Sequence, residues 1–256
     1  MSFKPICKMN LLLSEPRFLK EPVSIISEIV NEVKFKFDSD KIELTAMDPA
    51  KISLVNFKIL SSAFVEYEVQ DRLELAISLE SLKSVLNRAK SSDTIKIELD
   101  KNKNCLKIQL KGETTRTFNI SLLELDEEEK KIPDLNFPLK IDMPSVNLND
   151  AIDDISVVSD AVALIAHNDK LILEAESSIN SAKVEIPKSE SVLINLKGDS
   201  VKSRYGIEYL KKFLKGSKIS ENVTLEFGKD YPIRVNYLVK DKLELSFIMA
   251  PRVPND

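Results

Sequence analysis

Few residues of this sequence have reactive side chains that are spaced so that they could support catalysis or metal binding. They are the single histidine, His167, the adjacent pair Asp153 and Asp154, and an acidic run at residues 126–129. A histidine beside a carboxylate can act as a general base, and grouped carboxylates can hold a divalent cation. His167, however, precedes an Asn-Asp dipeptide that favours a turn, which is typical of a solvated histidine rather than a catalytic one.

The spacing of the acidic residues and the cysteines matches no metal-binding motif. The run 126–129 lacks the alternating ligands of an EF-hand loop, and the aspartate pair lacks a partner cluster. Cys7 and Cys105 lie far apart, match no zinc or redox spacing, and are expected to be reduced thiols. We therefore predict no metal and no cofactor, and the alternative of a metal-dependent nuclease is disfavoured.

Phosphate-binding and nucleophile motifs are also missing from the sequence. None of the five glycines forms GxGxxG, precedes a Lys-Ser or Lys-Thr pair, or builds a nucleophile elbow. These glycines are Gly112, Gly198, Gly206, Gly216 and Gly228. With one histidine and no tryptophan besides, the sequence predicts a protein that is not an enzyme.

Composition limits the kinds of partner. The 256 residues are 43% hydrophobic and 30% charged, which suffices for a sizeable core with a polar exterior. No apolar stretch approaches the ~18–20 residues that cross a bilayer, and the opening segment lacks a signal-peptide layout. We expect no membrane partner, and a protein that stays in the compartment where it is made. Because the net charge is −4, any DNA contact must be confined to one face.

The sequence contains one unit twice. Residues 40–46, DKIELTA, reappear as residues 169–175, DKLILEA, at an offset of 129. Residues 80–99 align with residues 208–227 at an offset of 128, where IKIE in the first block matches VTLE in the second. A nearly constant offset across separated blocks indicates a tandem duplication of a unit of about 125 residues.

Each copy predicts the order helix, strands, helix, further strands. The predicted helices cover residues 21–33, 79–90, 147–158 and 207–217, and the predicted strands of the first copy cover 34–37, 41–45, 53–59, 94–99, 106–110 and 115–123. Two helices gathered on one face of an antiparallel sheet give the α+β class. We predict an N-terminal domain at 1–123 and a C-terminal domain at 139–256. The connecting loop at 124–138 has like charges and two prolines, which disfavour a packed element.

Three of the four predicted helices carry basic residues on their exposed stripes. Such stripes can contact phosphates without regard to base sequence. The candidate DNA-facing residues are Lys20, Lys83, Arg88, Lys90, Lys211, Lys212 and Lys215. A lysine stripe is often only a solvated face, but recurrence at equivalent places of the repeat favours the DNA hypothesis. The predicted helix at 147–158 is evidence against the DNA hypothesis, because its exposed face carries Asp150, Asp153 and Asp154 and no basic residue.

Three motifs occur in order along the duplicated chain. AMDPAKISLV covers residues 46–55, LLELD at 122–126 leads to Ile132-Pro133, and IMAPRV covers residues 248–253. Together they resemble the proliferating cell nuclear antigen (PCNA) family, the DNA sliding clamps of archaea and eukaryotes, over essentially the whole chain. The resemblance implies the DNA clamp fold, with two domains of the same topology. It also implies a trimeric ring whose helices line a hole for double-stranded DNA.

The resemblance implies that edge strands of neighbouring subunits pair to close this ring. An edge strand has unpaired backbone groups that invite such pairing. The implied interface residues are Thr115, Arg116, Thr117, Phe118 and Ile120 on one strand, and Ser181, Ala182, Lys183, Val184 and Ile186 on the other. The alternative is two ordinary edge strands, guarded by Arg116 and Lys183.

The resemblance also implies a pocket that accepts a client peptide with an aromatic or aliphatic plug. The implied pocket residues are Met47, Ile52, Leu54, Leu125, Ile132, Pro232, Ile248, Ala250 and Pro251. The alternative is that these are plain core residues, Leu54 in particular. Lys130 stands where the family often has an apolar residue, and Ile248 where it often has an aromatic one. We therefore expect a shallower pocket with a different client preference.

The implied function is that of a DNA polymerase sliding clamp, which holds other proteins on DNA. The implied partners are a clamp loader, DNA polymerase, flap endonuclease and DNA ligase. A checkpoint-type clamp, or a peptide-binding scaffold that does not serve the replicative polymerase, is the alternative. We expect the protein in the cytoplasm at the nucleoid of an archaeon, or in the nucleus of a eukaryote.

The acidic helix at 147–158 departs from the family, which usually carries basic residues there. Many crenarchaeal archaea build the ring from distinct paralogues, and a subunit with uneven charge suits such a heterotrimer. The sequence therefore suggests the hypothesis of a crenarchaeal paralogue whose two ring partners are different chains.

Overall fold

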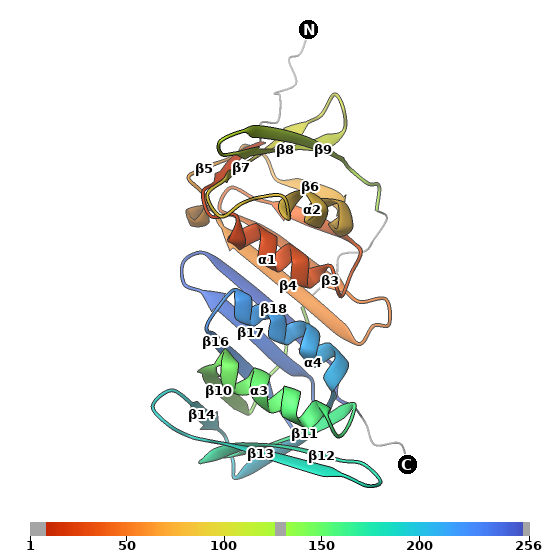
Figure 1. Cartoon of the computed structure of the whole chain (residues 1–256), viewed down its shortest axis with the longest axis vertical. Helices are drawn as coiled ribbons and strands as arrows, with labels where there is room; N and C mark the ends of the chain where they lie inside the picture. The colour runs from red at the N-terminus through yellow and green to blue at the C-terminus, as the bar shows by residue number, and fades with distance from the viewer. Residues whose placement is uncertain (1–8, 126–131, 253–256) are drawn as a thin grey trace. The chain divides into compact units, whose positions relative to one another are not determined.

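The computed structural model describes residues 9–125 and 132–252, and it divides into two compact units (Figure 1). Unit 1 comprises Met1–Ala46, Asn56–Lys131 and Val239–Glu244, and unit 2 comprises Met47–Val55, Ile132–Leu238 and Leu245–Asp256. Each unit thus takes a short segment from the other half of the sequence. The domain boundaries predicted at 123 and 139 stay a prediction.

The first half of the chain alternates short strands with two helices. Its elements are β1 (Met9–Leu13), α1 (Arg17–Ile26), β2 (Glu32–Phe37), β3 (Lys41–Met47), β4 (Ser53–Leu60), the 3-10 turn η1 (Ser61–Ala63), β5 (Glu66–Val69), β6 (Leu73–Ser78), α2 (Leu79–Leu86), β7 (Thr94–Asp100), β8 (Cys105–Lys111) and β9 (Thr115–Ser121). Two sets of neighbouring strands result, in the orders β5-β1-β7-β8-β9 and β4-β3-β2-β6. Apolar residues alternate with polar ones along these strands, as in β2, where Val33, Phe35 and Phe37 are buried.

The second half repeats this order of elements. Its elements are β10 (Leu139–Pro144), α3 (Ser145–Ser156), β11 (Ala161–His167), β12 (Lys170–Glu176), β13 (Ser181–Pro187), β14 (Leu193–Leu196), β15 (Ser200–Gly206), α4 (Ile207–Leu214), the 3-10 turn η2 (Lys215–Lys218), β16 (Asn222–Phe227), β17 (Ile233–Val239) and β18 (Leu243–Met249). The strand orders β14-β10-β16-β17-β18 and β13-β12-β11-β15 correspond one to one with those of the first half.

The duplication extends to the strand register. Cross-strand partners in the first half reappear in the second at offsets of 128 to 130 residues, so the two copies pair their strands in the same way. Two such matched sets are Leu11–Ile97 with Ile141–Leu225, and Val33–Ile77 with Val162–Tyr205. The predicted α+β fold with two copies of one topology is confirmed.

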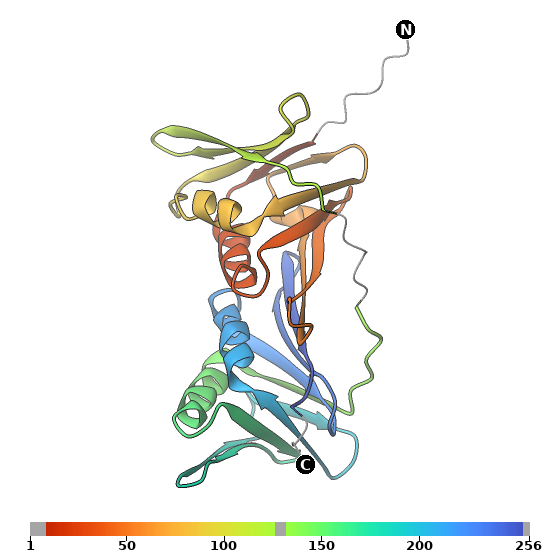
Figure 2. The same cartoon turned by 90° about the vertical axis from the view of Figure 1, so that its right-hand side faces the viewer.

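The two helices of each unit lie on one side of that unit's strands (Figures 1 and 2). Each helix buries an apolar stripe, in α4 formed by Ile207, Leu210, Phe213 and Leu214. The Phe213 ring stacks on Phe247 of β18, with 4.6 Å between ring centroids, and this contact anchors α4 in unit 2. Polar residues are consequently left on the opposite stripe of the helix.

The first helix differs from its prediction. It runs from Arg17 to Ile26 rather than over 21–33, and Pro22 lies inside it instead of opening it. The prediction placed the proline in the first turn, where its missing N–H costs nothing, whereas here it is a buried interior residue. Val33 was assigned to the helix but lies in β2, because its alternation with Phe35 fits the period of a strand.

The other helices are shifted or shortened by a few residues. α2 ends at Leu86 instead of residue 90, and α3 begins at Ser145 instead of residue 147. α4 ends at Leu214 and continues as the 3-10 turn η2, where a Cβ on Gly216 would lie 2.3 Å from the Tyr237 ring. Only glycine permits this close approach. The six strands predicted in the first half begin and end within two residues of their predicted bounds, whereas β1, β5 and β6 were not predicted.

Candidate functional site

In unit 1, the predicted DNA-facing cations lie on α1, on α2 and just after α2. Lys20 is half-buried, and its Nζ donates a hydrogen bond of 3.4 Å to the carbonyl of Ala89, so it is partly committed to the fold. Lys83 is half-buried and Arg88 and Lys90 are exposed, and none of these three side chains has an ion-pair partner among the residues that the structure describes. Lys83, Arg88 and Lys90 are therefore available to phosphates.

In unit 2, the predicted lysines Lys211 and Lys212 are paired with acidic residues. Lys211 Nζ lies 3.1 Å from Oδ1 of Asp153 on α3. Lys212 Nζ lies 3.0 Å from Oε1 of Glu208 and 4.9 Å from the centroid of the Tyr209 ring. The acidic character of α3 is thus partly neutralised by the lysine that faces it from α4. The sequence did not reveal this pairing, because the partners are 58 residues apart.

A small cavity of about 300 Å³ lies between α3 and α4. It is lined by Asn149 and Asp153 from α3 and by Lys211, Lys215 and Lys218 from α4 and η2, among others. Asn149 donates a hydrogen bond of 3.1 Å to the Ser217 hydroxyl, which ties α3 to the turn η2. Lys218 was not among the predicted DNA-facing residues, although it belongs to the same cationic cluster.

The loop after β3, with the sequence Met-Asp-Pro-Ala-Lys, is organised by Asp48. This carboxylate is 4% exposed and accepts hydrogen bonds from the backbone N–H groups of Ala50, Ile52 and Ser53 at 3.1, 2.8 and 2.5 Å. The Tyr209 hydroxyl donates a fourth, of 2.7 Å. An aspartate that bonds the backbone two residues ahead is typical of such turns. Asp48 therefore fixes the loop and joins it to α4.

Hydrogen bonds and burial set the protonation states of Asp48 and Tyr209. Burial alone would raise the pKa of Asp48, but the hydrogen bonds from Ser53 and Tyr209, with two further backbone bonds, lower it below its ordinary value of 3.8. Burial and the hydrogen bond to Asp48 raise the pKa of Tyr209 to about 12. At neutral pH the phenol consequently keeps its proton and acts as the donor to a carboxylate.

The predicted client-pocket residues divide by exposure. Met47, Ile52 and Ile132 are large apolar side chains that are 37%, 42% and 45% exposed. Leu54 and Ile248 are buried in the core, at 5% and 6% exposure, as the alternative for Leu54 anticipated. The remaining members are exposed or half-buried, namely Ala250, Leu125, Pro232 and Pro251.

The structure brings two of these positions together directly. The Ala250 N–H donates a hydrogen bond of 3.0 Å to the Ile52 carbonyl in unit 2, which also contains Met47, Ile132 and Pro251. Lys130, the predicted departure in the connecting loop, and the acidic run 126–129 lie outside the described residues. The role of these residues as a client pocket stays a prediction.

The two predicted interface strands lie at the ends of their strand orders. β9 ends the order β5-β1-β7-β8-β9, and β13 ends the order β13-β12-β11-β15. Both strands have the same alternation of exposed and half-buried residues, with one buried isoleucine, Ile120 in β9 and Ile186 in β13. The exposed members are Thr115, Thr117, Ser181 and Lys183, and the half-buried members are Arg116, Phe118, Ala182 and Val184.

Arg116 does not guard its edge as the alternative supposed. Its guanidinium is bound by the buried carboxylate of Asp93 and donates a hydrogen bond of 2.8 Å to the Arg88 carbonyl. The carboxylate is in turn held by the Lys90 N–H at 2.8 Å. Arg116 therefore ties β9 to the segment after α2 instead of projecting into solvent.

Of the residues considered for catalysis, His167, Asp153 and Asp154 lie within the described ranges, and the acidic run 126–129 does not. His167 ends β11, and Cys105 is a buried free thiol. Among the described residues, no three histidine, cysteine, aspartate or glutamate side chains are grouped so as to hold a metal ion. Cys7 lies outside this part of the chain. No helix within the described ranges is long and apolar enough to cross a membrane.

Known proteins share both the sequence pattern and the fold of this chain. The family model for the N-terminal domain of proliferating cell nuclear antigen matches residues 9–130, and the model for its C-terminal domain matches residues 131–252. A DNA polymerase sliding clamp of Pyrococcus furiosus is 32% identical over 232 residues, which cover 90% of this chain and 93% of that protein. One of Nanoarchaeum equitans is 32% identical over 247 residues, covering 95% and 99%.

A solved structure agrees with these sequence comparisons. The crystal structure of PCNA from Thermococcus kodakaraensis superimposes with a TM-score of 0.89 at 26% sequence identity, and the match covers 95% of this chain and all of that one. Two family models that together span nearly the whole chain, the level of identity and the shared fold lead to one conclusion. The chain belongs to the proliferating cell nuclear antigen family.

Proposed function

We propose that the chain is one subunit of a closed ring that encircles double-stranded DNA and tethers other proteins to it. Family membership over both halves supports the function of a DNA polymerase sliding clamp, the name that its archaeal relatives carry, over the alternatives of a checkpoint-type clamp or a scaffold. Such a clamp is a non-catalytic processivity factor. It acts at genomic DNA, which in an archaeon means the nucleoid in the cytoplasm.

One observation carries the ring hypothesis: β9 and β13 are both edge strands, with matching alternation of exposure, at the ends of separate strand orders. An interface between two different edges of identical or related chains is heterologous, and it closes into a ring when the rotation between neighbours is right. The family implies three chains per ring. We propose that β9 of one subunit pairs with β13 of the next.

Contact with DNA is weak and indifferent to sequence in this proposal. Lys83, Arg88 and Lys90 supply cations in unit 1, and the cluster of Lys211, Lys215 and Lys218 supplies cations in unit 2. Cations on a helix bind phosphates electrostatically, so each contact is weakened by salt. A closed ring need not hold DNA tightly, because it cannot leave sideways. Weak contacts then permit sliding.

Client proteins would attach through the exposed apolar side chains of Met47, Ile52 and Ile132. A short peptide with an apolar anchor buries such side chains and gains affinity from them. We propose a clamp loader, DNA polymerase, flap endonuclease and DNA ligase as partners. Tethering raises their effective concentration at the template.

The ring partners are proposed to be distinct paralogues. Although Lys211 neutralises Asp153, two further acidic residues of α3, Asp150 and Asp154, remain exposed on the helix face. A homotrimer would present this acidic face three times to DNA, whereas a heterotrimer presents it once. The uneven charge therefore supports a heterotrimer, as in a crenarchaeal set of paralogues.

Electron cryomicroscopy of the assembled complex tests the proposal. The expected result is a ring of three chains in which α1, α2, α3 and α4 line the central hole and β9 pairs with β13 of the neighbour. Helices on the outer surface, or an open chain of subunits, would contradict it. The mass of the isolated chain by light scattering, alone and after mixing with candidate paralogues, separates a homotrimer from a heterotrimer.

A further inference from the structure

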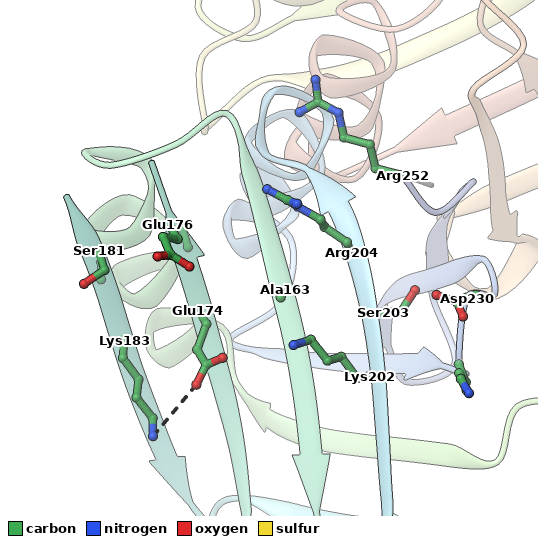
Figure 3. A pocket seen from close by; sticks show the side chains of 13 residues that line it. Ala163, Glu174, Glu176, Ser181, Lys183, Lys202, Ser203, Arg204, Asp230 and Arg252 are labelled. Carbon is green, nitrogen blue, oxygen red and sulfur yellow. Dashed lines mark ion pairs between the residues drawn. The ribbon is translucent and has the colours of Figure 1, made fainter. Parts of the chain in front are cut away.

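Unit 2 contains a groove beside the edge strand β13, from which it takes the predicted interface residues Ser181, Ala182 and Lys183 (Figure 3). This groove has a volume of about 680 Å³ and lies over the strands β13, β12, β11 and β15, with one side formed by the β16–β17 loop and Arg252. Figure 3 shows Lys202, Arg204 and Arg252 on one flank and Glu174 and Glu176 on the other. It is large enough for several residues of an extended peptide.

The strand register explains why the groove is open. Ala163 of β11 pairs with Glu174 of β12 on one side and with Arg204 of β15 on the other. Glu174 in turn pairs with Lys183 of the edge strand β13. In this row of side chains, Ala163 is the shortest, so the centre of the row is left as a floor between charged flanks.

The flank formed by β15 and the β16–β17 loop carries cations that the fold does not neutralise. Lys202, Arg204 and Lys229 have no ion-pair partner among the residues that the structure describes. Arg252 Nη1 lies 2.9 Å from Oδ2 of Asp160, and Lys183 Nζ lies 3.8 Å from Oε1 of Glu174. The positive charges of Arg252 and Lys183 are therefore partly compensated. Of the residues that the structure describes, five cations and three carboxylates line the groove, so their surplus charge is positive.

The first copy of the repeat has no such flank. At the positions equivalent to Ala163 and Arg204, unit 1 has Lys34 and Ala76, which form the same cross-strand pair. Lys34 also pairs with Glu74, the equivalent of Lys202, at 4.0 Å. In unit 1, Lys34 thus occupies the position of the floor residue Ala163, and Glu74 occupies the position of Lys202. The cationic groove is consequently not a property of the fold as such.

The residues that hydrogen-bond to the backbone of β6 in unit 1 and of β15 in unit 2 also differ between the copies. The Leu123 N–H donates a hydrogen bond of 2.9 Å to the Ala76 carbonyl, and the Arg252 N–H donates one of 2.6 Å to the Arg204 carbonyl. The backbone contact is conserved between the copies, but the side chain changes from leucine to arginine. The differences Glu74 to Lys202, Ala76 to Arg204 and Leu123 to Arg252 add positive charge to unit 2, whereas Thr45 to Glu174 adds a carboxylate on the opposite flank.

The groove continues from the proposed client site. The Ala250 N–H bonds the Ile52 carbonyl, and two residues later the Arg252 N–H bonds the Arg204 carbonyl. Residues 250–252 therefore run from the exposed Ile52 side chain to the cationic flank. A peptide anchored at the first place has the second within reach of the few residues beside its anchor.

We propose that this groove binds an acidic segment that flanks the apolar anchor of a client protein. The proposal rests on the proposed function and specifies the chemistry of its clients. Glutamate and aspartate side chains complement Lys202, Arg204 and Lys229, and contacts of this kind favour specificity and the association rate. Single-stranded nucleic acid suits the groove less, because the lining within residues 9–125 and 132–252 includes three carboxylates and no aromatic side chain for stacking.

Fluorescence anisotropy with synthetic peptides tests this proposal on the full chain. The labelled probes share one apolar anchor and carry six glutamates or six serines on either side of it. On one of the two sides, the glutamates are expected to lower the dissociation constant about tenfold at low salt, as several exposed ion pairs would. This gain should disappear at high salt because the contacts are screened.

Two charge-reversal variants locate the effect. In K202E/R204E the gain from the glutamates is expected to vanish while binding of the serine peptide is unchanged. K101E/K103E, which makes the same charge change on an exposed loop of unit 1, is expected to keep the gain. An equal loss in both variants, or no gain from the glutamates on either side, would overturn the proposal.

The serine peptide separates this inference from the proposed client site. If the serine peptide fails to bind, the proposed anchor site is wrong. The groove proposal then stands only if the glutamate peptide still binds and if its binding is weakened in K202E/R204E but not in K101E/K103E. A twelve-residue oligothymidine that binds more tightly than the glutamate peptide, and loses affinity in K202E/R204E but not in K101E/K103E, would replace the peptide proposal with a nucleic-acid site.

Discussion

The hydroxyl of Tyr209 donates a hydrogen bond of 2.7 Å to Oδ2 of Asp48. This bond connects α4, a predicted DNA-facing helix, with the loop between Met47 and Ile52, two residues of the proposed client site. Lys212 adds a cation over the Tyr209 ring, 4.9 Å from its centroid. One buried carboxylate thus holds both the loop backbone and the helix, so we expect changes at Asp48 or Tyr209 to affect both surfaces.

Tyr209→Phe removes this hydrogen bond and leaves the rest of the ring in place. We expect a loss of about 1–2 kcal/mol in the free energy of unfolding, because one hydrogen bond to a charged acceptor is lost. Urea denaturation measures the change. Tyr231→Phe is a matched control, since no hydrogen bond from the Tyr231 hydroxyl is found among the described residues. Equal losses in the two variants would contradict the role given to Tyr209.

Acid should weaken the contribution of Asp48. Its pKa is lowered below 3.8 in the folded chain, so its stabilising effect is present above that value and is lost as pH falls through the folded pKa. We expect the wild type to be more stable than Asp48→Asn at pH 7, and the difference to shrink below about pH 4. Thermal melts of both proteins between pH 3 and 7 measure this. A difference that stays constant down to pH 3 would count against a lowered pKa.

Much of the fold was predictable because duplication and strand periodicity are local patterns. The offset of 129 that joins residues 40–46 to 169–175 reappears as matched strand pairing. The start of α1 was not predictable, since Pro22 satisfies the usual signal for a first turn but lies in the helix interior. Only packing against the core decides between the two placements.

The contacts of the site were less predictable than its residue types. Asp48 and Tyr209 are 161 residues apart, and Lys211 and Asp153 belong to different helices, so a single sequence does not reveal their pairing. The acidic face of α3 was correctly noticed, but its partial neutralisation by Lys211 needed the structure. The groove of unit 2 was missed, because its cations come from β15, the β16–β17 loop and residue 252.

Phe118→Asp is expected to block ring assembly. Phe118 is half-buried on the edge strand β9, and a carboxylate there would be buried without a partner when β13 of a neighbour pairs with the strand. In a ring of three distinct chains the variant disrupts one of the three interfaces, so sedimentation of the variant with each ring partner separately should show that the complex with one partner is lost. The circular dichroism of the variant should match the wild type.

Val157→Asp provides the control for this change. Val157 is 83% exposed beside α3, away from both edge strands in the sequence, and the same substitution there should leave assembly intact. If Phe118→Asp still assembles as well as Val157→Asp, β9 is not the interface.

Asp153→Asn should strengthen the dependence of DNA binding on salt. The substitution releases Lys211 from its ion pair, and a freed lysine can neutralise one more phosphate. The slope of log affinity against log salt should then become steeper by up to about 0.9. Filter binding on short linear duplexes measures the slope. Asp154→Asn removes the same charge without releasing a paired lysine, so a matching change in both variants would show that Lys211 is not involved.

Retention on DNA tests the topological claim most directly. The ring, assembled with its partner chains and loaded on nicked circular plasmid, is washed in about 1 M NaCl, which abolishes ordinary phosphate contacts. We predict that it stays on the circle and is released when a restriction enzyme linearises the plasmid. Loss from circular and linear plasmid at the same rate in high salt would contradict a ring that encircles the duplex.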